Sequence, residues 1–131
     1  MPKVQLTRVL YVEDDRDIQQ IATLALETVG GLSVQVCSSG RDAVSVATGF
    51  APDCILLDVM MPGMDGPATL ASLRADAATA SIPVIFMTAK VHPAEVEELK
   101  SLGAIGVITK PFNPMTLAAE VRAHFDGERT S

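Results

Sequence analysis

Charged and hydroxyl-bearing side chains follow four of the apolar runs in this sequence, at the point where each run ends. The segment 13–15 (Glu-Asp-Asp) follows the first run, and Asp58 follows the third. The segment 88–90 (Thr-Ala-Lys) closes the fourth run, and Lys110 follows the fifth. Ligands of open α/β sheets bind beyond the carboxyl ends of the strands. If the runs are parallel strands, we expect these carboxylates, a hydroxyl and an ammonium group to converge on one rim.

Such a set of groups is suited to Mg²⁺ and to phosphoryl chemistry. Carboxylates, a backbone carbonyl and water are oxygen ligands that Mg²⁺ accepts, and the ion retains positions for phosphate oxygens. A carboxylate beside the metal can act as a nucleophile toward a phosphoryl group. Lys110 could neutralise charge there, and Thr88 could donate a hydrogen bond to a phosphoryl oxygen.

Each of these residues also has a structural explanation. The acids at 13–15 could cap a following helix, because carboxylates favour the positive end of the helix dipole. Asp58 could be an ordinary turn residue, and Lys110 a solvated surface cation. Clustered carboxylates repel one another unless a cation holds them, however. The joint placement therefore favours a binding site over several independent coincidences.

The elements that must position these residues alternate between short apolar runs and longer helical periodicity. The pattern predicts strands over 8–12, 32–36, 53–57, 82–87 and 104–109. It predicts helices over 17–29, from an N-cap at 38–39 through 47, and over 67–75, 93–102 and 114–125. Such alternation indicates parallel βαβ units with helices on both faces of the sheet. Residues 1–6 and 126–131 are expected to fray.

Composition and charge exclude several classes of protein. The chain has 131 residues, 48% of them hydrophobic, which fits one globular domain rather than a disordered segment. A net charge of −6 disfavours direct binding of nucleic acid. The sequence shows no secretory signal and no apolar run of about 20 residues, so we expect a cytoplasmic protein without a membrane span. Cys37 and Cys54 are expected to be buried free thiols.

Four motifs give the chain a resemblance to a known family. They are 9–15 (VLYVEDD), 55–66 (ILLDVMMPGMDG), 83–90 (PVIFMTAK) and 109–112 (TKPF). In this order and spacing they resemble the receiver domains of two-component response regulators, including the single-domain chemotaxis type. The resemblance covers about residues 7–125. It implies a flavodoxin-like α/β fold with five parallel strands in the order 2-1-3-4-5 and five helices.

The resemblance also implies a phosphoacceptor and a metal site. Asp58 corresponds to the phosphorylated residue and Asp14 to a direct Mg²⁺ ligand, with Glu13 acting through water. Met60 would offer its main-chain carbonyl to the metal. Asp15 is the third acid of the motif and is expected to cap the following helix.

The remaining matched positions concern switching and tuning. Thr88 corresponds to the switch hydroxyl, and Lys110 to the phosphate-pairing ammonium, with a cis bond expected to Pro111. Val107 stands where the family often has an aromatic ring that changes rotamer. The switch is therefore expected in the loop at Ala89 and Lys90 and in the helix that begins at Pro93. Met60 and Lys90 occupy positions that tune hydrolysis, and neither orients water, so we expect a phosphoryl lifetime of minutes or longer.

The resemblance names partners as well as residues. A sensor histidine kinase or a histidine phosphotransfer protein would supply the phosphoryl group. A target protein would dock on the face of the fourth helix, fifth strand and fifth helix. The chain would be a signalling domain rather than an enzyme with turnover, because a dehalogenase-type phosphohydrolase would need an acid at Met60. A flavodoxin-like cofactor module is disfavoured because the acids at 13–15 would repel a flavin phosphate.

Residues 1–131 would then form a single receiver domain without an output domain. The start at Met1 and the short polar tail favour a protein that signals by docking. Two alternatives stay open: a receiver excised from a larger regulator or hybrid kinase, and a degenerate receiver used as an interaction module.

Overall fold

The computed structural model describes residues 5–89 and 92–130, with side chains placed up to residue 127. Over these residues the chain forms a parallel sheet of five strands in the order β2-β1-β3-β4-β5. The strands are β1 Arg8–Val12, β2 Ser33–Cys37, β3 Cys54–Asp58, β4 Val84–Thr88 and β5 Gly106–Thr109. The helices are α1 Arg16–Leu24, the π-helical η1 Ala25–Val29, α2 Ala43–Phe50, α3 Gly66–Ala75, α4 Pro93–Ser101 and α5 Leu117–Thr130. The predicted α/β fold and strand order are confirmed.

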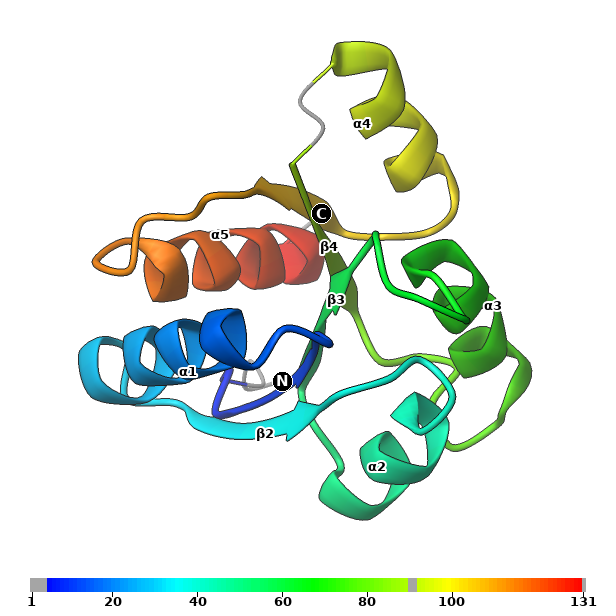
Figure 1. The fold of residues 1–131 in the computed structure, drawn as a ribbon, viewed down its shortest axis with the longest axis horizontal. Helices are drawn as coiled ribbons and strands as arrows, with labels where there is room; N and C mark the ends of the chain where they lie inside the picture. Colours follow the sequence, from blue (N-terminus) through cyan, green and yellow to red (C-terminus); the bar gives the residue numbers. More distant parts are fainter. Residues whose placement is uncertain (1–4, 90–91, 131) are drawn as a thin grey trace.

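Helices cover both faces of the sheet (Figure 1). α1, η1 and α5 pack on one face, over a core that includes Tyr11, Leu56 and Ile108. α2, α3 and α4 pack on the other face, against residues such as Leu57 and Phe86. Because both faces are covered, β3 and β4 are buried along their whole length, as their continuous apolar sequences indicate. β2, in which apolar and polar residues alternate, lies at an edge, as the strand order implied by the resemblance requires.

The helical periodicity of 17–29 predicts one buried stripe made of Ile18, Ile21, Ala22, Ala25 and Val29, and this prediction is partly wrong. Ala22 and Leu26 are fully buried, but Ile21 and Val29 are 48% and 46% exposed. The helix ends in the π-helical turn η1, which holds more residues per turn than an α-helix.

Two predicted helix starts are also wrong. Ser39 does not begin a helix, because its hydroxyl bonds Asp42 within a turn, and α2 begins at Ala43. The segment 114–116 forms a second turn, in which the Asn113 carbonyl accepts from the amides of Thr116 and Leu117, so α5 begins at Leu117.

The expected frayed ends are more ordered than predicted. α5 continues to Thr130, so residues 126–130 are helical. Leu6 is buried in the core, and its carbonyl accepts a hydrogen bond from Arg122. Residues 1–4 lie outside the described part of the chain. Cys37 and Cys54 are buried free thiols, as expected. No helix within residues 5–89 and 92–130 has both the length and the apolar character needed to cross a membrane.

Candidate functional site

Three carboxylates meet at the carboxyl ends of β1 and β3. Oxygen atoms of Glu13, Asp14 and Asp58 all lie within 4.8 Å of one another. Glu13 and Asp58 are only 1% and 3% exposed, whereas Asp14 is open to solvent. β1 and β3 are neighbours in register, so the residues that follow Val12 and Leu57 come to the same rim. A set of oxygen donors with one side open suits a hard divalent cation such as Mg²⁺.

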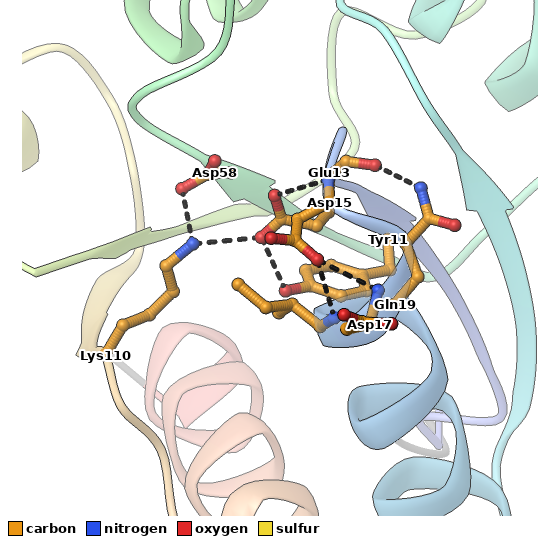
Figure 2. A network of polar contacts seen from close by, with 8 residues as sticks. Tyr11, Glu13, Asp15, Asp17, Gln19, Asp58 and Lys110 are labelled. Atoms are coloured by element: carbon orange, nitrogen blue, oxygen red, sulfur yellow. Dashed lines mark hydrogen bonds and ion pairs between the residues drawn. The ribbon is translucent and has the colours of Figure 1, made fainter.

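Lys110 bridges two of these carboxylates from the end of β5 (Figure 2). Its Nζ lies 2.9 Å from Glu13 Oε1 and 3.0 Å from Asp58 Oδ1. Burial lowers the pKa of the Lys110 ammonium, but the hydrogen bonds and charges of Glu13 and Asp58 outweigh it, so the pKa is raised. The Lys110 side chain therefore remains protonated, and it supplies one positive charge to a cluster of three carboxylates.

A buried tyrosine supports the same cluster from below. Tyr11 is fully buried, and its hydroxyl donates to Glu13 Oε1 over 3.1 Å. Burial, together with Glu13, raises the pKa of this phenol, so it remains a neutral donor. We did not predict this role from the sequence. The sequence did contain a signal for this contact. Tyr11 and Glu13 are two positions apart, and residues with this spacing in a strand point to the same face.

Local hydrogen bonds hold the backbone of the acidic segment. The amide of Asp15 donates to Glu13 Oε2 over 3.2 Å. Asp15 Oδ1 accepts from the amides of Asp17 and Ile18 at the start of α1, so Asp15 is the predicted helix cap. Gln19, also absent from the sequence predictions, donates to the Glu13 carbonyl and, over 3.1 Å, to Ser38 Oγ. Figure 2 shows the contact of Asp15 with the Glu13 carboxylate and that of Gln19 with the Glu13 main chain.

Thr88 reaches the same rim on the side of α4. It ends β4, is buried, and pairs in register with Thr109, the residue before Lys110. Its carbonyl accepts from the Lys110 amide over 2.8 Å. Thr88 lines a cavity of about 210 Å³ with Val59 and three residues of α4, which are Glu95, Glu98 and Leu99. Thr88, whose hydroxyl is expected to switch, thus ends the strand beside β3 and lines a cavity with α4.

The other predicted positions are distributed around the rim. The Met60 side chain is exposed just after β3, and Ala89 is exposed after β4. Val107 is partly buried and packs against the core between the sheet and α2–α4. The Lys110–Pro111 peptide bond is cis, as expected. Lys90 lies outside the described residues.

Comparison with known proteins gives one consistent family. A family model for the response regulator receiver domain matches residues 9–122. The chain is 36% identical over 116 residues to the DNA-binding response regulator MtrA of Mycobacterium tuberculosis (strain ATCC 25618 / H37Rv), covering 88% of this chain and 49% of that protein. It is 37% identical over 118 residues to the transcriptional regulatory protein YvrH of Bacillus subtilis (strain 168), covering 88% and 48%. The chain spans about half the length of these curated relatives.

Solved structures agree with this match. The chemotaxis response regulator CheY4 of Vibrio cholerae superposes with a TM-score of 0.83 and 31% identity, covering 92% of this chain and 99% of that chain. The receiver domain of a signal transduction histidine kinase from Syntrophus aciditrophicus gives a TM-score of 0.78 and 32% identity, covering 95% and 94%.

Proposed function

The chain belongs to the response regulator receiver domain family, and from that premise we propose that Asp58 accepts a phosphoryl group with the help of Mg²⁺. A receiver domain is a signalling domain of two-component systems rather than a classical enzyme. The observation that carries the proposal is the position of the Asp58 carboxylate. It lies in a cluster of oxygen donors and is paired to the ammonium of Lys110, which follows another strand.

In the proposed step an Asp58 carboxylate oxygen attacks the phosphorus of a phosphohistidine. The O–P bond forms as the N–P bond breaks, and the leaving imidazole nitrogen takes a proton from solvent. The Lys110 ammonium moves from the Asp58 carboxylate to a new phosphoryl oxygen. The Thr88 hydroxyl donates a hydrogen bond to another phosphoryl oxygen. Glu13, Asp14, Asp58 and the main-chain carbonyl of Met60 would hold the Mg²⁺, which supplies positive charge to the phosphoryl oxygens.

The surface beside the site supports a protein as the phosphoryl donor. An apolar cavity of about 330 Å³ adjoins Lys110 and is lined by α1 residues, such as Ile21, and by Pro111 and Phe112. A sensor histidine kinase or a histidine phosphotransfer protein could cover this surface while it presents its imidazole to Asp58. A cytoplasmic location is part of the same proposal.

The proposed output surface is the face of α4, β5 and α5. It is supported by the cavity that Thr88 shares with α4, because rearrangement around a new dianion would first act there. Val107 stands where the family often has an aromatic ring. In this proposal the loop after Thr88 and α4 therefore undergo the conformational change. Amide chemical shifts should move on this face when a phosphoryl mimic is bound. Unchanged shifts there would contradict the proposed surface.

We further propose that residues 1–131 act as one receiver domain that does not contact nucleic acid directly, a reading supported by the net charge of −6. The mycobacterial relative is named as a DNA-binding response regulator, and the relative from Bacillus subtilis as a transcriptional regulatory protein. This chain matches about half of the length of each. A receiver cut from a larger regulator or hybrid kinase is the alternative, and it would use the same site.

The test is intact mass spectrometry after incubation with acetyl phosphate. The wild-type chain should gain one phosphoryl group with Mg²⁺ and none with a chelator. Asp58→Asn should gain none, while Asp126→Asn, which alters an exposed acid on α5, should behave like wild type. No gain in wild type would overturn the proposal and favour a degenerate receiver used as an interaction module.

A further inference from the structure

We propose that Tyr11 is a positioning residue for the cation site, and that its hydroxyl holds Glu13 in place while Lys110 is exchanged. This inference rests on the proposed function, because it concerns the same cluster of carboxylates. It assigns a role to a buried hydroxyl within motif 9–15, where the resemblance gave roles only to the acids at 13–15.

The two oxygens of the Glu13 carboxylate have different partners. Oε1 accepts from the Tyr11 hydroxyl over 3.1 Å and from Lys110 Nζ over 2.9 Å. Oε2 accepts from the Asp15 amide over 3.2 Å. Figure 2 shows the phenol entering from beneath Glu13 and the ammonium from the side of Asp58. Glu13 Oε1 therefore accepts from two donors, a neutral hydroxyl and a charged ammonium.

The two donors differ in their freedom to leave. Tyr11 belongs to a central strand and is fully buried in the core under α1 and α5. Its ring is packed within the core, and its hydroxyl donates to Glu13. The Lys110 ammonium lies at the end of a long side chain near the edge of the sheet. It divides its hydrogen bonds between Glu13 and Asp58. Tyr11 is thus the permanent donor and Lys110 the exchangeable one.

A divalent cation among the carboxylates would make this difference matter. The cation repels the Lys110 ammonium, so the Tyr11 hydroxyl is then the side-chain donor that keeps Glu13 Oε1 oriented in the site. Removing a hydrogen-bond donor from a buried carboxylate is costly. The hydroxyl should therefore stabilise the cation-loaded form more than the free form, where Lys110 shares the same oxygen. Partners of this kind orient a site's carboxylates and typically affect metal affinity.

The variant Tyr11→Phe keeps the ring and removes only the hydroxyl. We expect its Mg²⁺ dissociation constant, measured by calorimetry with magnesium chloride, to rise by about tenfold. Thr79→Val is the matched control, because Thr79 is also fully buried and its hydroxyl donates to the Leu73 carbonyl over 2.6 Å, before the start of β4. Thr79→Val should lower thermal stability but leave the Mg²⁺ constant within twofold of wild type.

The composition of the chain offers a second readout. Tyr11 is its one tyrosine and there is no tryptophan, so ultraviolet tyrosine emission reports on this side chain alone. Magnesium chloride should change the wild-type emission with the same midpoint that calorimetry gives.

The outcomes separate this inference from the proposed function. A raised constant in Tyr11→Phe alone, together with a saturable change of emission, supports the positioning role. An equal constant in Tyr11→Phe and wild type, or equal losses in both variants, overturns it and leaves the proposed function standing. Absence of Mg²⁺ binding in wild type overturns both.

Discussion

Lys110 gives the acidic cluster a cation before any metal binds. Two carboxylates that are almost wholly buried would destabilise the fold if they faced each other unpaired. The ammonium, within 3.0 Å of both, offsets part of that penalty. The sequence indicates that clustered carboxylates repel one another unless a cation holds them, and Lys110 is such a cation within the chain itself.

Removing this ammonium should make stability depend on metal. Lys110→Met leaves Glu13 and Asp58 buried without their cation, so the free energy of unfolding in a chelator should fall by about 3 kcal/mol. Mg²⁺ should restore a larger share of stability to this variant than to wild type. Chemical denaturation with and without Mg²⁺ measures both effects. The control is Lys100→Met, an exposed change on α4. A Mg²⁺ effect no larger than in wild type would contradict the role given to Lys110.

At the scale of elements, the start of α3 is pressed against the end of β3. A Cβ at Gly66 would lie 2.7 Å from the Asp58 carbonyl oxygen and 3.1 Å from the Phe86 ring. The Gly66 amide also donates to the Val59 carbonyl over 2.9 Å, which closes the loop after Asp58. The absence of a side chain here lets the loop fold back beside the proposed phosphoacceptor.

Gly66→Ala should therefore displace the Asp58 main chain. We expect a loss of about 1–3 kcal/mol in the free energy of unfolding, from overpacking, and slower phosphorylation by acetyl phosphate. Gly49→Ala is the matched control, since a Cβ there meets nothing within 4 Å inside α2. That change should stabilise the chain by up to about 1 kcal/mol, because alanine favours helix. Equal behaviour of the two variants would exclude the close contact at Gly66.

The elements also show how far the sequence alone could predict this site. Continuous apolar runs ending in polar residues located Glu13, Asp58, Thr88 and Lys110 correctly, because parallel strands align their carboxyl ends. Tyr11 was missed because a hydroxyl inside an apolar strand is indistinguishable from core packing until its partner is known. The starts of α2 and α5 were missed because local side-chain and turn hydrogen bonds compete with helix.

For the whole molecule, the packing of α5 on the sheet adds a pH dependence. The His124 ring fills the space above Gly106 in β5, where a Cβ would lie 2.2 Å from Nδ1. Burial lowers the pKa of this imidazole below its usual 6.5, Lys100 of α4 acts in the same direction, and Glu120 opposes them. The unfolded chain therefore binds the His124 proton more tightly than the folded chain.

It follows that this contribution to stability is complete above pH 6.5 and is lost as the pH falls toward the lower folded pKa. Denaturation at a series of pH values between about 8 and 5 should show a decline below pH 6.5. In His124→Gln the decline over this window should be smaller. An identical decline in both proteins would contradict the assignment to His124.

In the proposed function one carboxylate, at the end of β3, carries the phosphoryl group. The most direct measurement is reductive trapping with borohydride after incubation with acetyl phosphate and Mg²⁺, followed by peptide sequencing with mass spectrometry. An acyl phosphate on Asp58 is reduced to homoserine, whereas free carboxylates are not. The structure predicts a single homoserine, at position 58. Homoserine at Asp14 or another aspartate, hydroxynorvaline at Glu13 or another glutamate, or a phosphoryl group that survives on a histidine instead, would contradict it.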